Sequence, residues 1–157
     1  GPLIDAKAAN AVCEMIDDAV KGGATIHCGG KRADLPGSFV EPTVIGDVTK
    51  TMRVFREEIF GPVAPLLKFS NEEEAIAMAN DSDVGLASYF YTRDIGRIWR
   101  VSEALEYGII GINEGIISTE VAPFGGMKES GNGREGSKYG LDDYTEIKYL
   151  CMGGIDK

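Results

Sequence analysis

The stretch PFGGMKESGNGRE, residues 123–135, is the most informative part of this 157-residue sequence. Glycines alternate there with charged side chains, and one aromatic residue stands near the start. A flexible linker is rich in Ser, Gly and Pro but does not need this ordered mixture. Repeated glycines indicate positive φ angles or close backbone approaches at several points. The stretch therefore predicts a shaped loop within a folded domain.

The overall composition sets limits on the class of protein. The length is typical of one domain, and 43% hydrophobic residues are enough to bury a core. The formal net charge is −9, with 25 acidic against 16 basic side chains. Because phosphate-rich surfaces are bound by basic patches, this balance argues against a nucleic-acid or membrane partner.

The cysteines predict neither a disulfide framework nor a metal site. Cys13, Cys28 and Cys151 are widely spaced, and His27 is the one histidine. Cys13 stands among acidic residues, which disfavours a thiolate nucleophile. We therefore expect reduced thiols in an intracellular compartment, no metal and no nucleophile from these residues.

Helix-like and strand-like stretches alternate along the chain, which predicts an α/β fold around a mostly parallel sheet. Asp5 can cap a helix that ends near Lys21, before two glycines. The apolar residues of this helix recur at helical spacing: Val12, Met15, Ile16, Ala19 and Val20. Strand candidates follow at residues 25–28, 39–45, which Pro42 marks as an edge or a connection, and 63–69.

The second half continues the alternation. Ser70 and Glu73 form a capping box for a helix to about residue 80, and residues 86–91 predict a strand. Asp94 can cap a helix to about residue 107, with an expected inward face of Ile95, Ile98, Trp99, Ser102 and Leu105. Residues 109–113 are apolar and β-branched, as in buried parallel strands. Ligands in open α/β sheets lie beyond the carboxyl ends of strands, so the loop after residue 113 is expected to hold a site.

Residues 144–151 predict a final strand, with aromatic and β-branched side chains at a chain end. Nothing follows to cover its edge, and such an edge favours pairing with another subunit.

Two motifs resemble signatures of the aldehyde dehydrogenase superfamily. Residues 123–135 are similar to the PFGGxKxSGxGRE signature near the C-terminus of that family, and EEIFGP, residues 57–62, is similar to a second one. The stretches GINEGIIS, residues 111–118, and SKYG, residues 137–140, are most similar to succinate-semialdehyde dehydrogenases. The resemblance runs from residue 1 to about residue 154.

The resemblance implies that residues 1–143 are the C-terminal part of an aldehyde dehydrogenase catalytic domain and residues 144–157 an oligomerisation strand and tail. In the family, the nucleophilic cysteine, the general-base glutamate and the dinucleotide-binding domain precede the matched region. We therefore expect a fragment that carries no catalytic residue and is inactive alone.

The resemblance assigns cofactor contacts to Glu58 and Phe60. A carboxylate can accept hydrogen bonds from both hydroxyls of a ribose, and an aromatic ring can pack on a flat nicotinamide. In the family, the matching glutamate holds the nicotinamide ribose and the matching phenylalanine positions the ring. The residues alone also allow solvated Glu57 and Glu58 and a core Phe60.

Ser118 and Phe124 are the expected substrate contacts. The resemblance implies that Ser118 donates to a substrate carboxylate and that Phe124 lines the aldehyde tunnel; a lone loop serine is otherwise a turn residue. Glu114 departs from the threonine common at its position in the succinate-semialdehyde group. Its extra anion argues against a carboxylate-bearing substrate.

The pattern GxGxxG at residues 131–136 is not expected to be a dinucleotide fingerprint, because no apolar strand precedes it and no helix follows. Its glycines are expected to shape a loop. Lys128, Arg134 and Glu135 are expected to form ion pairs that order this loop rather than to act in catalysis.

The resemblance implies that the chain is part of an NAD- or NADP-dependent oxidoreductase that converts succinate semialdehyde to succinate. The expected partners are the small-molecule aldehyde, the N-terminal part of the enzyme and further copies in a homo-oligomer, in the cytoplasm or the mitochondrial matrix. A dehydrogenase for another aldehyde and a non-catalytic interaction module are the alternatives. The groups that distinguish NAD from NADP lie upstream, and the aldehyde's chain length is not fixed.

Overall fold

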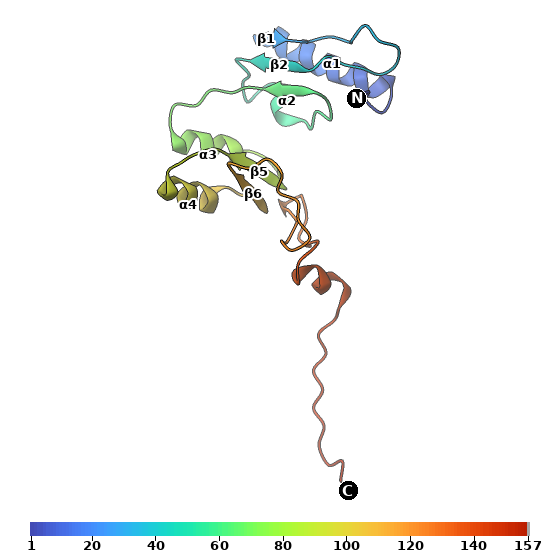
Figure 1. Ribbon diagram of the computed structural model, residues 1–157, viewed down its shortest axis with the longest axis vertical. Helices are drawn as coiled ribbons and strands as arrows, with labels where there is room; N and C mark the ends of the chain where they lie inside the picture. Colours follow the sequence, from blue (N-terminus) through green and yellow to red (C-terminus); the bar gives the residue numbers. More distant parts are fainter. Residues whose placement is uncertain (157) are drawn as a thin grey trace. The chain divides into compact units, whose positions relative to one another are not determined.

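A computed structural model describes residues 1–156 and divides the chain into two compact units, Gly1–Ser70 and Asn71–Lys157 (Figure 1). The elements of unit 1 are α1 (Ala6–Lys21), β1 (Thr25–Cys28), β2 (Thr43–Gly46), α2 (Arg53–Arg56) and β3 (Val63–Pro65). The elements of unit 2 are α3 (Glu72–Asn80), β4 (Val84–Gly85), β5 (Ala87–Phe90), α4 (Ile95–Ala104), β6 (Ile109–Ile112), β7 (Met127–Lys128) and the 3₁₀ helix η1 (Tyr139–Tyr144).

Helix α1 begins where the sequence predicts. The Asp5 carboxylate accepts a hydrogen bond from the Ala8 N–H at 2.7 Å, which satisfies one of the first unpaired donors of the helix. The helix ends at Lys21, and Gly23 follows with a φ of 101°. Its apolar stripe is buried at Ala9, Val12, Met15, Ile16 and Ala19. The expected helix, cap and inward face are all confirmed, except that Val20 is 42% exposed.

The sheet of unit 1 has the order β1-β2-β3. Strand β2 pairs antiparallel with β1 and parallel with β3. Ile45 in β2 is fully buried and packs in one cluster with Met15 and Ala19 of α1. Partly buried Ile59 and Val63 pack against both core clusters of this unit. The segment between α2 and β3 is therefore fixed to a well-packed support.

Unit 2 contains two small sheets. Strands β5 and β6 pair in parallel, with Ala87 opposite Ile109, and α4 is the crossover between them. Strands β4 and β7 pair antiparallel, with Val84 opposite Lys128. The α/β class is confirmed, and the sheets combine two parallel and two antiparallel pairings.

Unit 2 buries far less apolar surface than unit 1. Val101 and Leu105 are its buried hydrophobic residues among those described. Ile95 and Trp99 were predicted to face inward, and this was wrong, because they are 68% and 64% exposed. The helical spacing of these residues is correct, but no other element covers that side of α4 within the described chain.

Several predicted boundaries shift. Helix α3 is capped by Asn71, whose side chain accepts from the Glu74 N–H at 2.8 Å, and not by Ser70. The strand expected at residues 39–45 forms later, at Thr43–Gly46, and the strand expected at residues 63–69 is shortened to Val63–Pro65. Helix α4 ends at Ala104, three residues before the predicted end.

The strand predicted at residues 144–151 does not form within this chain. Tyr144 belongs to η1, and residues 145–156 contain no strand (Figure 1). The large apolar side chains there are exposed, among them Ile147, Tyr149 and Leu150. A strand needs a neighbour for its backbone N–H and C=O groups, and the described part of the chain supplies none here.

Candidate functional site

Glu58 and Phe60 lie in the segment between α2 and β3 of unit 1. The two neighbouring carboxylates there differ in environment. Arg53 binds Glu57 with two hydrogen bonds, of 2.6 and 2.9 Å, and these hydrogen bonds lower the pKa of Glu57. The side chain of Glu58 is exposed. The side chain of Glu57 is exposed as well, so the two carboxylates differ in the contact that Arg53 makes with Glu57 and not in their exposure.

Phe60 adopts an unusual backbone conformation. Its φ is 46°, in the left-handed region that bulky residues rarely enter, and its side chain is 80% exposed. The next residue, Gly61, lies so close to Val12 of α1 that an added Cβ would stand 2.6 Å from a Val12 methyl group. This close approach holds the segment against the core, while the Phe60 side chain remains exposed. Strained backbone of this kind is common at ligand-binding positions. The interpretation of Phe60 as a core residue is wrong.

Ser118 lies in the loop that follows the carboxyl end of β6, as the topology rule predicts. Its side chain is exposed. The loop is ordered at its start by Asn113, which has a φ of 56° and exchanges two hydrogen bonds with Thr92 of 2.9 and 2.7 Å. Glu114 follows, and its carboxylate accepts from the N–H groups of Gly115 and Ile116 at 2.8 and 3.1 Å. The N–H groups of Ile116 and Gly115 lower the pKa of Glu114. This anion is therefore engaged by its own loop.

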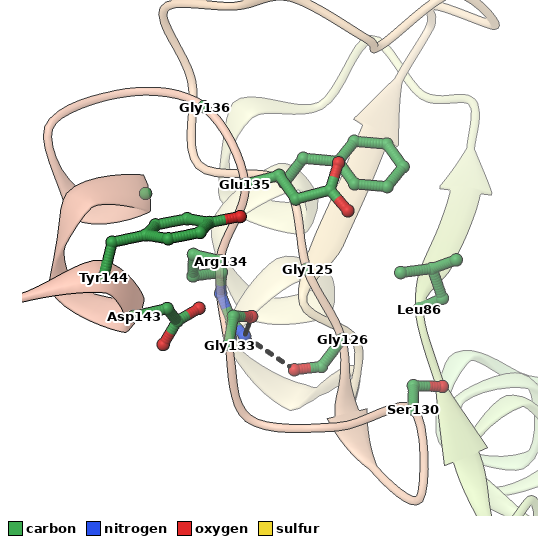
Figure 2. A pocket seen from close by; sticks show the side chains of 12 residues that line it. Leu86, Gly125, Gly126, Ser130, Gly133, Arg134, Glu135, Gly136, Asp143 and Tyr144 are labelled. Carbon is green, nitrogen blue, oxygen red and sulfur yellow. Dashed lines mark hydrogen bonds between the residues drawn. The ribbon is translucent and has the colours of Figure 1, made fainter.

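Phe124 lines an open pocket of about 680 Å³ within unit 2. Its backbone exchanges two hydrogen bonds with Glu135, of 2.9 and 2.7 Å, which close residues 124–135 into a loop. Asp143 and Tyr144 face Leu86 across the pocket (Figure 2). Ser118 is not among the lining residues, so the structure does not place the two expected substrate contacts in one pocket.

The charged residues of the loop differ in their roles. Lys128 forms the expected ion pair, with Glu106 at 2.5 Å. Arg134 binds backbone carbonyls instead of a carboxylate, donating to Gly126 and Gly133 at 2.9 and 2.8 Å (Figure 2). Because the Arg134 guanidinium is used to order the loop, the ion pair expected of it is wrong. The side chain of Glu135 is exposed.

The GxGxxG pattern lies in a loop, as predicted. Gly131 and Gly136 have φ angles of 100° and 64°, and no helix begins within the pattern. The two-residue strand β7 precedes it and the 3₁₀ helix η1 follows it, and neither is the buried strand or the α-helix that a dinucleotide fingerprint requires.

The cysteines give no evidence for a nucleophile. Burial raises the pKa of the Cys13 thiol, which reduces its thiolate fraction. Cys28 and Cys151 are exposed. Residues 1–156 contain no group of three or more His, Cys, Asp and Glu side chains that could hold a metal ion. Within the same range, no helix is long and apolar enough to cross a membrane.

Sequence reasoning missed two features of these sites. One is the exposed, left-handed Phe60, which could be suspected only from its position before Gly61 and Pro62. The other is the set of carbonyl groups around the Lys128 ammonium, to which Asn80 and Ser82 contribute. Those residues stand 48 and 46 positions away in the chain, so no local pattern indicates the contact.

Comparison with protein families and with individual proteins gives consistent matches over nearly the whole chain. The sequence model of the aldehyde dehydrogenase family matches residues 1–150. The chain is 62% identical to a mitochondrial succinate-semialdehyde dehydrogenase of rice, over 99% of this chain and 30% of that protein. It is 61% identical to a glutarate-semialdehyde dehydrogenase of Pseudomonas aeruginosa, over 99% of this chain and 32% of that protein. An NADP(+) succinate-semialdehyde dehydrogenase of Escherichia coli is 60% identical over 98% of this chain and 32% of that protein.

Solved structures agree with these matches. A succinate-semialdehyde dehydrogenase from Burkholderia pseudomallei superposes with a TM-score of 0.94 at 58% identity, over 97% of this chain and 32% of that one. An aldehyde dehydrogenase from Bacillus cereus in complex with NAD+ superposes with a TM-score of 0.89 at 45% identity. This match covers 94% of this chain and 30% of that one. The chain thus spans about a third of the length of the proteins it matches.

Proposed function

The chain belongs to the aldehyde dehydrogenase family, and we propose that it is the C-terminal part of a semialdehyde dehydrogenase that oxidises succinate semialdehyde to succinate with NAD or NADP. Its role in that enzyme is to supply contacts to the cofactor and the substrate. The nucleophilic cysteine and the general base belong to the part of the polypeptide that precedes it in family members.

The observation that supports this proposal most strongly is the pairing of exposed Glu58 with exposed, left-handed Phe60. The bound nicotinamide supplies the hydride acceptor. Glu58 can accept from the hydroxyls of the ribose, and Phe60 can pack against the ring. Both groups stand on a segment fixed by Gly61 against α1, so they can hold a reactive geometry with little loss of conformational freedom.

A carboxylate-bearing aldehyde is compatible with the Ser118 loop. Glu114 raised an objection to such a substrate, because its anion would repel a second one. Its carboxylate stays ionised, but it is bound by the N–H groups of Gly115 and Ile116, whose dipoles offset part of its charge. That arrangement supports a loop in which the Ser118 hydroxyl remains free to donate.

The alternatives differ in substrate or in class. A dehydrogenase for another semialdehyde is supported by the Pseudomonas aeruginosa relative, whose name gives glutarate semialdehyde. A non-catalytic interaction module would not need the exposed carboxylate and ring at Glu58 and Phe60. We place the enzyme in the cytoplasm or the mitochondrial matrix, and the rice relative is named mitochondrial.

Replacing Ser118 with alanine in the full-length enzyme tests the substrate class. We expect the KM for succinate semialdehyde to rise roughly ten- to a hundredfold, since a hydrogen bond to a charged group contributes roughly 1.5–3 kcal/mol. The KM for an uncharged aldehyde of similar length should change little, because that substrate has no carboxylate. Steady-state kinetics with both aldehydes measure the difference.

The neighbouring hydroxyl provides a matched control. Thr119 is also exposed, and Thr119→Val should affect the two aldehydes equally. Equal effects of Ser118→Ala on both aldehydes would mean that Ser118 is a turn residue and that the proposed substrate is wrong.

Deleting residues 144–157 from the full-length enzyme tests the proposed oligomerisation strand. The exposed apolar side chains beyond η1 need a partner, and an unpaired β-prone segment can supply a strand to another sheet. We therefore expect a lower oligomeric order by sedimentation velocity. Deleting only residues 152–157 should leave the assembly intact, and an unchanged oligomer after the longer deletion would refute the role.

A further inference from the structure

Lys128 adopts a left-handed backbone conformation that is usual for glycine, and its side chain binds distant parts of unit 2. Its φ is 55°, which costs free energy for a residue with a side chain. Despite this cost, the position carries a long cationic side chain that is only 26% exposed. The strain is offset if the side chain makes interactions that glycine cannot make.

The Lys128 ammonium is fully satisfied. It donates to the carbonyl oxygens of Asn80 and Ser82 at 2.8 and 2.9 Å and pairs with the Glu106 carboxylate at 2.5 Å. An ammonium has three N–H donors, and three acceptors surround this one. Such charge-assisted hydrogen bonds are stronger than neutral ones.

These acceptors lie at the C-terminal end of α3 and just beyond the ends of α3 and α4. Asn80 is the last residue of α3, where carbonyl groups lack helical partners and the helix dipole favours a cation. The Asn80 side chain donates to the Ala104 carbonyl of α4 at 2.8 Å and accepts from the Glu106 N–H at 2.9 Å. Lys128 therefore ties β7 to a junction that already joins α3 and α4.

The same junction fixes the residues that precede Lys128. Gly108, just beyond α4, lies against the Gly125 carbonyl so closely that a Cβ could not fit between them. On the other side, the Glu129 N–H donates to Asp83 at 2.9 Å and the Gly85 N–H donates to the Ser130 hydroxyl at 3.0 Å. Phe124 stands at the start of this docked turn and in the wall of the pocket.

We propose that Lys128 is a positioning residue that holds the Phe124 loop in the shape required for substrate binding. The proposal rests on the proposed function, in which Phe124 lines the substrate tunnel. Lys128 itself does not touch the substrate. It acts by anchoring the loop at one end, while the hydrogen bonds between Phe124 and Glu135 close the other.

Lys128→Met in the full-length enzyme tests the anchor, because methionine keeps an unbranched apolar stem and removes the charge. Amide exchange across residues 124–136 should quicken about tenfold, the factor that corresponds to ~1.4 kcal/mol of lost local stability. The KM for succinate semialdehyde should rise severalfold with a smaller change in kcat, since a displaced wall weakens binding in the ground state and the transition state alike. Lys128→Arg keeps the charge and should recover most of the loop order.

Two further variants separate the inference from the proposed function. Lys138→Met removes an exposed lysine, which contacts the Tyr139 ring at 5.0 Å, and should change neither exchange nor KM. In a Phe124→Leu background, Lys128→Met should no longer raise KM, because coupled residues are not additive. Unchanged amide exchange across residues 124–136 in Lys128→Met would overturn the proposal that Lys128 anchors the loop. Fully additive effects of Lys128→Met and Phe124→Leu on KM would overturn it as well. A Phe124→Leu enzyme with a normal KM would instead refute the role of Phe124 in the substrate tunnel. The amide-exchange measurement on Lys128→Met would still test whether Lys128 anchors the loop.

Discussion

The isolated 157-residue chain is expected to reduce neither NAD nor NADP in the presence of succinate semialdehyde. Aldehyde oxidation in this family needs a thiolate to attack the carbonyl carbon and a base to activate water. The pKa of Cys13 is raised by burial, Cys28 and Cys151 are exposed, and the family resemblance implies that the nucleophile precedes this chain. Holding a cofactor and an aldehyde in place cannot replace a missing nucleophile. Absorbance of the reduced nicotinamide over several hours measures the rate.

Restoring the rest of the enzyme provides the positive control. Co-expression with the N-terminal two-thirds of a close relative should restore activity, because unit 2 leaves large apolar side chains such as Trp99 exposed for another part of the protein to cover. Cofactor reduction by the isolated chain that disappears on mutation of Cys13, Cys28 or Cys151 would contradict the proposal that the nucleophile lies in the N-terminal part of the enzyme.

Glu58→Gln in the full-length enzyme is expected to slow hydride transfer by roughly ten- to a hundredfold, since a lost hydrogen bond to a charged group is worth about 1.5–3 kcal/mol. Glutamine keeps the shape of the side chain but replaces one acceptor oxygen with a donor amide, so one ribose hydroxyl loses its partner. The ring is then held less well for hydride transfer. Because Glu58 is exposed in unit 1, thermal stability should change little. Pre-steady-state absorbance measures the hydride step directly.

Glu57→Gln is the matched control for this experiment. The Glu57 carboxylate is bound by Arg53 within α2, so its loss should leave the hydride step almost unchanged. An unchanged hydride step in Glu58→Gln, or equal slowing in both variants, would remove Glu58 from the cofactor site.

The local parts of the fold could be predicted from the sequence. Helix α1 has its cap, its apolar stripe and its terminating glycines within the same stretch of chain, and each of these signals lies within a few residues of its effect. Strands β1, β5 and β6 were recognisable for the same reason, whereas the parallel pairing of β5 with β6 joins segments about twenty residues apart and was not predicted. The residue types of the candidate site could also be read directly, because Glu58, Phe60, Ser118 and Phe124 stand in motifs.

Predictions failed where the outcome depends on distant neighbours. The inward face of α4 was predicted from spacing alone, but burial of Ile95 and Trp99 needs an element that the described chain does not place over them. The strand predicted at residues 144–151 has the right composition, yet a strand exists only where another strand pairs with it.

Residue identity and spacing thus determined the family resemblance, the α/β class and the candidate contacts. Tertiary structure alone decided that Phe60 is strained and exposed, that Glu114 is turned onto its own loop, and that Lys128 binds the end of α3. The physical reason is that exposure, backbone strain and hydrogen-bond partners depend on segments brought together by folding. Asn80 and Lys128 are 48 residues apart in sequence, and only the packed structure makes them neighbours.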